Sequence, residues 1–311
     1  MRSTNPIRLV GARAGRAFLL CAAASLLTLA AASPAAAQAG KGKSVTPAPS
    51  PAPALVRTTT RHEIRRFGFG NTLTIGGAPV GSVTVEGWSR PEVEITADVE
   101  LRANTEEELA LLAGLNTFLL DEDATHFRVV TTGTHDRQFM KKVKNFPRHL
   151  LAMPWKIDYR VKAPAAVDLE IFAGRGAVKV SGVEGALQLN AGESDTALEL
   201  AGGDLVATIL GGKFSLDVTA RSWRGRGASV RVVSGEVRVA LPANFNGEIE
   251  AKVLRSGRVE DAYGSFAAGA GSARDARTLK AVAGSGGARL QFEVGDGLIR
   301  FERYEGAGAR R

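Results

Sequence analysis

The sequence predicts an all-β protein built as a β-solenoid-like stack of short glycine-cornered strands, with one small helix and a basic insertion. Three observations lead to this prediction. Apolar and polar residues alternate from residue 64 onward, a glycine-led unit recurs from residue 167 to about residue 260, and one segment has leucines at helical spacing. A β-sandwich with short hairpins is the alternative. The stack is favoured because the strands are short and regular and few Asn-Gly or Asp-Gly pairs occur.

The first 37 residues are predicted to be a signal peptide. Four arginines and no acids precede an apolar run from Ala17 to about Ala32, and the small residues that end at Ala37 fit a cleavage site. This run is shorter than the ~20 residues that a spanning helix needs. Cys21, the single cysteine, lies inside the run, so the mature chain would contain no disulfide. We expect an exported protein of the periplasm, the cell envelope or the extracellular space.

Three segments follow the signal peptide. Residues 38–61 are predicted to be a Pro/Ala-rich disordered linker, residues 62–303 the β-repeat domain, and residues 304–311 a disordered tail. Removing residues 1–37, which hold four arginines and no acids, lowers the formal net charge from +8 to +4. This charge is too small for a chain of this length to indicate a nucleic-acid partner.

One helix is predicted within residues 104–118. Asn104 or Thr105 can cap it, and three glutamates occupy its first turn, where they favour the helix dipole. Leu109 and Leu112 lie on one face, so we expect the helix to cover an end or a face of the β structure. Around it, alternation predicts half-buried strands at residues 73–99, 127–131 and 155–161.

The repeated unit consists of glycine followed by alternating apolar residues. It begins at Gly176, Gly185, Gly203, Gly212, Gly235 and Gly247, with variants at Thr196 and Gly227. Glycine, Asp or Asn at each corner suits the backbone of a tight turn. Because side chains alternate between the faces of a strand, we predict one dry aliphatic column that includes Val178, Leu187, Leu198, Phe214 and Val237. The strands within residues 279–303 are expected to close the last coil.

Together these features resemble a known family. The signal peptide, the segment GSVTVEGWSRPEVEI (residues 81–95), the glutamate-rich helix, the strand pair IDYRVKAPAAVDLEI (residues 157–171) and the repeated unit are similar to the bacterial β-strand-repeat "putative adhesin" family, whose function is unknown. The resemblance covers about residues 62–302 and implies an exported β-repeat fold rather than an activity. The basic insertion and the RSWRGRG break (residues 221–227) depart from the family's usual pattern.

The sequence contains no catalytic, cofactor-binding or metal-binding pattern. The histidines, which never pair at metal-ligand spacing, are His62, His126, His135 and His149. Nucleophile-elbow, P-loop and dinucleotide-binding motifs are absent. A glycosidase needs paired carboxylates beside stacking aromatics, and the repeats offer only Trp223 as an aromatic platform. We therefore expect solvated turn acids at Glu193, Asp195, Asp204 and Asp217.

Residues 134–151 form the basic insertion. It contains one acid, Asp136, and five cations that are candidates for contact with an anionic surface: Arg137, Lys141, Lys142, Lys144 and Arg148. Phe139, Val143 and Phe146 have helical spacing, so a short helix before Pro147 would carry an apolar stripe beside a basic face. Such a segment can lie on an anionic membrane or polymer. The alternative is a lid that caps the end of the stack with solvated lysines.

A second basic cluster surrounds Trp223. Its members are Arg221, Arg224, Arg226 and Arg231. We expect it to bulge out of the coil, or to form a loop that contacts an anion or a sugar.

The sequence favours a non-catalytic exported β-repeat protein that serves as an adhesion, scaffold or interaction module of the cell envelope or surface. The partner is unknown. An anionic envelope polymer, a membrane surface or a protein is a candidate, and nucleic acid is not. The alternatives are a periplasmic sensor associated with envelope stress or signalling, held near the membrane by uncleaved residues 1–37, and a carbohydrate-active enzyme.

Export with cleavage makes a direct prediction. The N-terminus of the protein recovered from the periplasm or the medium should lie near Gln38 or Gly40, because small residues precede this point. N-terminal sequencing of the recovered protein measures this. A membrane-bound chain that keeps residues 1–37 would contradict cleavage and favour the sensor.

Overall fold

The computed structural model describes residues 53–266 and 273–305, so the predicted signal peptide and most of the predicted linker lie outside the described residues. The strands are β1 (Leu55–Arg66), β2 (Thr72–Val80), β3 (Val83–Trp88), β4 (Glu92–Ala103), β5 (Thr117–Glu122), β6 (His126–Thr132), β7 (Trp155–Pro164), β8 (Asp168–Ser181), β9 (Ala186–Leu200), β10 (Gly202–Val218), β11 (Arg224–Leu241), β12 (Gly247–Asp261), β13 (Ala273–Arg274), β14 (Thr278–Ala283) and β15 (Arg289–Arg303). The helices are α1 (Glu106–Ala113), α2 (Arg137–Met140) and the 3-10 helix η1 (Arg148–Ala152). The described part is therefore all-β, as predicted.

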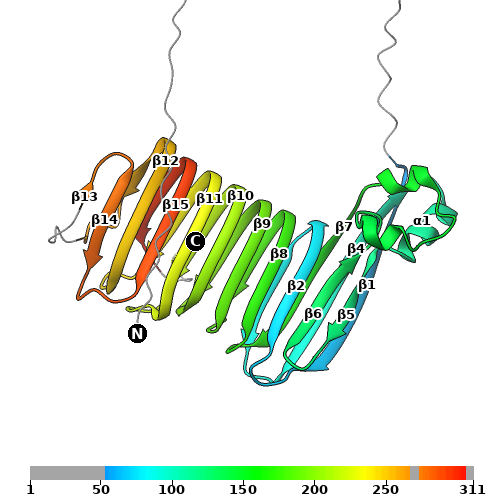
Figure 1. Ribbon diagram of the computed structural model, residues 1–311, viewed down its shortest axis with the longest axis horizontal. Helices are drawn as coiled ribbons and strands as arrows, with labels where there is room; N and C mark the ends of the chain where they lie inside the picture. The colour runs from blue at the N-terminus through cyan, green and yellow to red at the C-terminus, as the bar shows by residue number, and fades with distance from the viewer. Residues whose placement is uncertain (1–52, 267–272, 306–311) are drawn as a thin grey trace, which may run out of the picture. The chain divides into compact units, whose positions relative to one another are not determined.

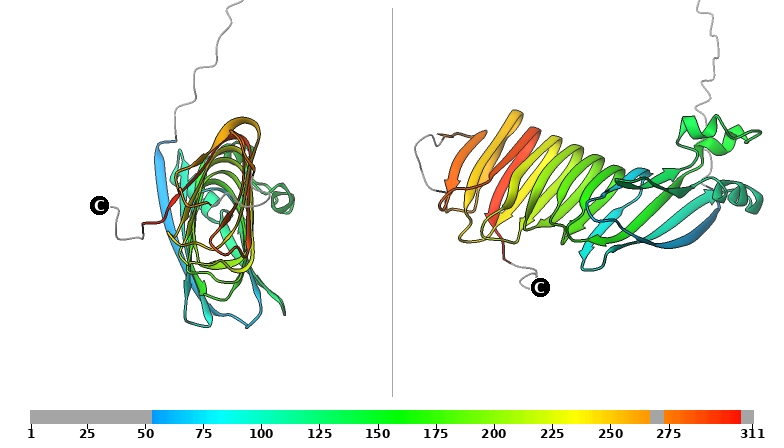
Figure 2. Two further views of the ribbon diagram at one scale, coloured as in Figure 1. Left: turned by 90° about the vertical axis from the view of Figure 1, so that its left-hand side faces the viewer. Right: turned by 60° about the horizontal axis from the view of Figure 1, so that its bottom comes forward.

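A parallel ladder of long strands forms the centre of the fold. Its order is β8-β9-β10-β11-β15-β12, and all of these strands belong to one sheet (Figure 1). Each neighbouring pair is joined over two halves that lie on either side of a corner, and the register is kept across the corner except between β12 and β15, where it shifts after Val253. Seen along the ladder, the bent strands lie over one another (Figure 2). Equivalent residues of successive strands therefore form straight rows across the ladder.

The ladder continues into the N-terminal part of the sheet. β2 pairs with the first half of β8 and β3 with its second half, and Gly81 lies between β2 and β3. Beyond this point the sheet divides. β6 and β5 continue from β2, whereas β7, β4 and β1 continue from β3. The division leaves room for α1 and the basic insertion at this end (Figure 1).

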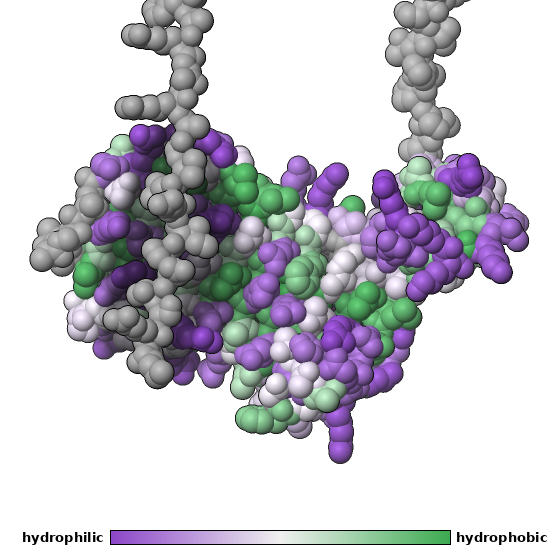
Figure 3. All heavy atoms as spheres, viewed as in Figure 1, coloured by the Kyte–Doolittle hydropathy of each residue, from purple (hydrophilic) through white to green (hydrophobic). Residues whose placement is uncertain are grey.

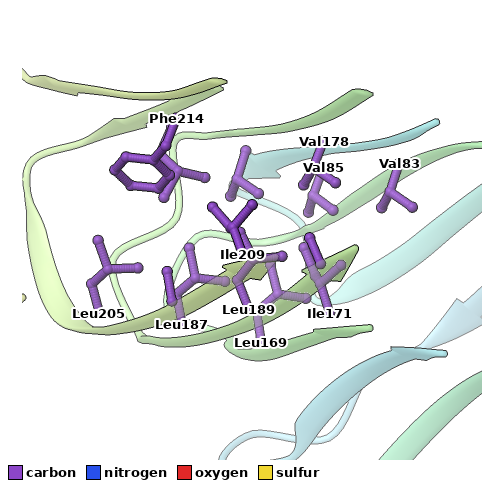
Figure 4. Packing of buried hydrophobic residues seen from close by; sticks show 14 of the residues in the cluster. Val83, Val85, Leu169, Ile171, Val178, Leu187, Leu189, Leu205, Ile209 and Phe214 are labelled. Atoms are coloured by element: carbon purple, nitrogen blue, oxygen red, sulfur yellow. The ribbon is translucent and has the colours of Figure 1, made fainter. Parts of the chain in front are cut away.

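The predicted aliphatic column is confirmed. Its five residues are at most 2% exposed and belong to one core cluster: Val178, Leu187, Leu198, Phe214 and Val237. Figure 4 shows the same packing around the aromatic ring of Phe214, which lies among aliphatic side chains from neighbouring strands. Within each half, a strand contributes a buried apolar side chain at every second position, and the alternation is interrupted at the corner, between Ile209 and Phe214 in β10 and between Val232 and Val237 in β11.

The corners bring the backbones of neighbouring strands unusually close. Gly212 has a φ of 111°, and a Cβ atom at this position would lie 2.3 Å from the carbonyl oxygen of Ser194. Gly235 has a φ of 149°, and its Cβ would lie 1.9 Å from the carbonyl oxygen of Gly212. Both the backbone angle and the space therefore require glycine. These contacts allow each bent strand to follow the corner of the one beside it.

The sequence led us to expect that the strands within residues 279–303 close the last coil, but the C-terminal strand, β15, does not. β15 lies between β11 and β12, and β14 and β13 follow β12 at the end of the sheet. β15 has a corner glycine, Gly297, and buried residues in both halves, so it matches the interior of the ladder. β14 is short and pairs antiparallel with β12. A short strand suits the exposed edge of a sheet.

The predicted helix is confirmed. Thr105 caps α1 by accepting a hydrogen bond from the backbone N–H of Glu108, at 3.2 Å, and Leu109 and Leu112 are buried. None of the helices in residues 53–266 and 273–305 is long and apolar enough to span a bilayer.

β1 begins at Leu55, inside the segment predicted to be linker. The alternation is hidden there because the half-buried face of β1 is polar. Arg57 forms an ion pair with Glu106 of α1. Arg61 donates a hydrogen bond of 2.7 Å to the carbonyl oxygen of Phe118 in β5, and its guanidinium lies 4.3 Å from the centre of the Phe118 ring. Charged groups thus join this edge strand to β5 and α1.

The corner glycines make a testable prediction. Gly212→Ala should lower the free energy of unfolding by about 2–4 kcal/mol, because it combines backbone strain with a steric clash. The matched control is Gly211→Ala, since the nearest atom to a Cβ at Gly211 is 3.7 Å away and its φ is not positive. The control should stay within about 1 kcal/mol of wild type. Urea unfolding measures both changes, and equal effects would contradict a glycine requirement at Gly212.

Candidate interaction surfaces

The charges on the outer face of the ladder are largely paired with each other. Arg238 of β11 contacts Asp217 at 2.7 Å and Glu302 at 2.5 Å. Arg300 of β15 contacts Glu260 at 2.6 Å, and its hydrogen bond lowers the pKa of that carboxyl group. These pairs run across the strands, because the in-register rows place opposite charges side by side. Arginines such as Arg238 and Arg300 are therefore paired within the ladder.

The four acids considered for glycoside hydrolysis have local partners. Glu193 lies 3.6 Å from Arg175, Asp204 lies 3.1 Å from Arg226, and Asp217 pairs with Arg238 as described above. Asp195 accepts a hydrogen bond of 3.3 Å from the backbone N–H of Lys213. Each of these acids therefore binds a partner in its own part of the ladder. Within the described ranges, no group of three or more His, Cys, Asp or Glu side chains could hold a metal ion.

Trp223 is a core residue and not an exposed aromatic platform. Its side chain belongs to the core cluster, is 5% exposed, and donates a hydrogen bond of 2.9 Å from Nε1 to the carbonyl oxygen of Gly203. A sugar ring cannot stack on it in this position. The structure therefore gives no support to the carbohydrate-active alternative at this residue.

The second basic cluster stays on the ladder, with a local irregularity. Arg224, Arg226 and Arg231 lie in β11, and the pairing of β11 with β10 shifts register between Arg224 and Gly227, as in a β-bulge. The three arginines form ion pairs with acids of neighbouring strands and loops: Arg224 with Glu184 at 3.2 Å, Arg226 with Asp204 at 3.1 Å, and Arg231 with Glu293 at 3.3 Å. The expected bulge is thus limited to a register shift within β11, and the sequence does not show which acids come to lie beside these arginines.

The basic insertion is not one continuous helix. α2 ends at Met140, turns follow, and η1 begins only at Arg148. Asn145 has a φ of 58°, a left-handed conformation that interrupts a helix. The predicted stripe is consequently spread over several turns, with Phe139, Val143 and Phe146 each half-buried.

All five candidate cations of the basic insertion are exposed: Arg137, Lys141, Lys142, Lys144 and Arg148. In the part of the chain that the structure describes, no ion pair within 4.0 Å joins any of them to a carboxylate. Asp136 caps α2 instead, accepting hydrogen bonds from the backbone N–H groups of Gln138 at 2.8 Å and Phe139 at 3.0 Å. Both hydrogen bonds lower the pKa of Asp136, and the bond from Phe139 has the larger effect. The insertion is therefore a local excess of positive charge.

Both ends of the basic insertion are attached to the fold. At the first end, the backbone N–H of Thr134 donates to Oδ1 of Asn116 at 2.9 Å. At the other end, Nε2 of His149 lies 3.0 Å from Oε1 of Glu108 in α1, and the neighbouring Leu150 is fully buried. The pKa of Glu108 is lowered mainly by the hydrogen bond from the backbone N–H of Asn104 and to a smaller extent by the hydrogen bond with His149. The insertion therefore covers this end of the β structure while its cations face solvent.

Besides the basic insertion, the structure has an exposed apolar surface beside the corners, which the sequence did not lead us to expect. Apolar doublets precede the corners in four strands, at Ile171-Phe172, Ile209-Leu210, Val232-Val233 and Val253-Leu254. The first member of each doublet is buried, and the second is 39–61% exposed. Leu210 lies opposite Val233, since the residues on either side of them are paired. Such doublets break the alternation of a strand, and this break is the signal that could have revealed the surface.

A groove of about 800 Å³ adjoins this apolar row. Its lining residues are Pro79, Gly174, Arg175, Gly192, Glu193, Leu210, Gly211, Gly212 and Ser234. Gly174 and Gly192 create the hollow because they have no side chains. We call the groove and the exposed doublet members Leu210, Val233 and Leu254 the corner surface, whereas Phe172 lies in another row, opposite Asn190. Hydrophobic patches interrupt the polar surface of the ladder in Figure 3. An apolar row beside a shallow groove suits contact with a macromolecule.

The attachment of the basic insertion can be tested by proteolysis. Leu150→Ala should remove about 2–5 kcal/mol of packing energy and loosen the insertion, so trypsin should cleave sooner at Lys141, Lys142 and Lys144. Leu151→Ala is the matched control, because Leu151 is 44% exposed. Electrophoresis of timed digests measures the cleavage rates. Equal rates in the two variants would contradict the anchoring role of Leu150.

No protein-family model matches this chain, and no curated protein matches it. Several solved structures are similar to it. A putative cell adhesion protein from Clostridium sporogenes has 12% identity and a TM-score of 0.45, covering 79% of this chain and 100% of that one. A putative adhesin from Bacteroides fragilis has 12% identity and a TM-score of 0.39, covering 79% and 97%. A putative lipid binding protein from Parabacteroides distasonis has 9% identity and a TM-score of 0.22, covering 78% and 96%. The resemblance to bacterial proteins named as adhesins, expected from the sequence, is thus found among solved structures.

Proposed function

We propose that this chain is a non-catalytic exported β-repeat protein that acts as an adhesion, scaffold or interaction module of the cell envelope or surface. In this proposal the parallel ladder is a β-solenoid, and a protein partner binds its corner surface. Export is inferred from residues 1–37, which have the charge and length pattern of a signal peptide.

The spacing of the ladder supports the solenoid. Leu187 pairs with both Leu169 and Leu205, so these successive strands are 18 residues apart. A distance of 18 residues along the chain is long enough for two short strand halves, the corner between them and a connection to the next strand. The next step, from Leu205 to its partner Ala228 in β11, is 23 residues. Bent strands paired in parallel at short spacings are typical of stacked coils. Such an architecture presents flat, regular faces, which suit binding to a large partner.

The corner surface is the observation that carries the proposed function. Leu210 is 61% exposed and lies opposite Val233, which is 39% exposed. Their neighbours Ile209 and Val232 already fill the core, so folding does not need the outer pair. Exposed apolar side chains that are aligned across strands are typical of protein contact surfaces. Arg175 and Glu193 beside them provide polar groups at the rim.

The sensor alternative differs from this proposal in its anchoring. It requires residues 1–37 to stay attached in the membrane, whereas an adhesion or scaffold module acts in either form. The N-terminal sequencing described above therefore separates the two roles.

The proposed contact predicts a specific loss of binding. The double variant Leu210→Ser/Val233→Ser should bind isolated cell envelopes of the producing bacterium roughly 30-fold more weakly, because burial of each half-exposed side chain contributes about 1 kcal/mol. Val206→Ser is the control, since Val206 is 47% exposed on β10 but lies outside the corner surface. Co-sedimentation of the full chain with envelopes measures binding.

Two results would contradict the proposed function. Unchanged binding by the double variant, or an equal loss in the Val206→Ser control, would exclude the corner surface as the contact. Release of soluble sugars from the envelopes by the wild-type chain would contradict the non-catalytic role.

A further inference from the structure

The cations of the basic insertion differ from most others in the molecule. Along the ladder, Arg226, Arg238 and Arg300 each contact a carboxylate within 3.1 Å. The five cations of the insertion are exposed, and the described part of the chain offers them no ion pair. An uncompensated cluster attracts an anionic surface strongly, because no internal pair has to be broken on binding.

Apolar side chains lie among these cations. Leu151 is 44% exposed, and Phe139, Met140 and Val143 are half-buried. None of these four is part of the core cluster or is packed against it, in contrast to Phe146. A soluble anionic polymer would bind the cations alone. A bilayer interface also accepts apolar side chains between basic ones, because headgroups and acyl chains lie next to each other there. The mixture therefore favours lipid over polymer.

The position of the insertion fits the same partner. The first strand, β1, begins at Leu55, which pairs with Ala103 just before α1. Arg57 then contacts Glu106 of α1, and Glu108 of the same helix holds His149 of the insertion. β1 therefore begins at the end of the sheet that carries the insertion. Figure 3 shows hydrophilic side chains crowded at this end of the molecule, with small hydrophobic patches between them.

We propose that the basic insertion docks on a bilayer that contains anionic lipids. Arg137, Lys141, Lys142, Lys144 and Arg148 contact the headgroups, and Leu151, with Phe139, Met140 and Val143, contacts the apolar layer beneath them. The contacts of Thr134, His149 and Leu150 keep the insertion attached, so binding does not require it to leave the fold. This inference rests on the proposed exported role, since only an exported chain meets the outer surface of such a membrane.

Vesicle binding tests the inference. The full chain is mixed with phosphatidylcholine vesicles made with and without phosphatidylglycerol, and co-sedimentation is measured. Lys141→Gln/Lys142→Gln/Lys144→Gln should weaken binding to the anionic vesicles roughly 100-fold, because each lysine at an anionic surface contributes about fivefold. Added salt should weaken wild-type binding in the same direction. Leu151→Ser should weaken it roughly fivefold through the loss of apolar contact.

The matched control removes the same charge elsewhere. Lys179, Lys213 and Lys252 are also exposed and form no ion pair in the described residues, but they lie on the ladder. Lys179→Gln/Lys213→Gln/Lys252→Gln should bind anionic vesicles like wild type. Because every variant carries the same N-terminal residues, any contribution from the apolar run cancels.

Three outcomes would overturn the inference. They are equal vesicle binding by the wild type and the insertion variant, an equal loss in the ladder control, and binding of the wild type to soluble anionic polysaccharide but not to vesicles. None of these results affects the corner surface, which is tested with other residues and another assay. Failure of the membrane contact and failure of the proposed function are therefore distinguishable.

Discussion

The backbone contact between neighbouring strands at the corners is the constraint on which the rest of the structure depends. A Cβ atom at Gly235 would lie 1.9 Å from the carbonyl oxygen of Gly212, so the two strands can bend together only when no side chain is present. Once the corners coincide, both halves of the strands from β8 to β11 and of β15 are held in register. The continuous core and the straight outer rows are consequences of that register.

The same register produces the surfaces. Inside, alternate residues such as Ile209 and Val232 meet in the core. Outside, Leu210 and Val233 come together in an apolar row. Gly174 and Gly192 leave a hollow beside that row because their strands have no outward side chain there. The corner surface is thus built from the geometry that allows the ladder to stack, and it needs no separate loop or pocket.

Charged side chains are paired differently along the ladder and at the N-terminal end of the sheet. Along the ladder, opposite charges in one row satisfy each other, as Arg238 does between Asp217 and Glu302. In the basic insertion the local acid, Asp136, caps α2, and among the described residues no carboxylate forms an ion pair within 4.0 Å with the five cations. A protein with a self-paired ladder and an uncompensated end can contact two different partners at once. The proposed contacts at the corner surface and at the insertion involve separate residues.

Local pattern determined the strands, the α1 cap at Thr105 and the burial of the column from Val178 to Val237, because alternation and capping depend on residues close together in the chain. Tertiary structure alone decided the rest. β15 enters between β11 and β12, Trp223 turns inward, and Arg231 finds Glu293, all through contacts between residues far apart in sequence. The helix predicted before Pro147 is shortened to α2, Arg137–Met140, and the two ends of the insertion are held by Asn116 and Glu108 from elsewhere. Periodicity records which side of a strand is apolar, but not which distant strand will lie beside it.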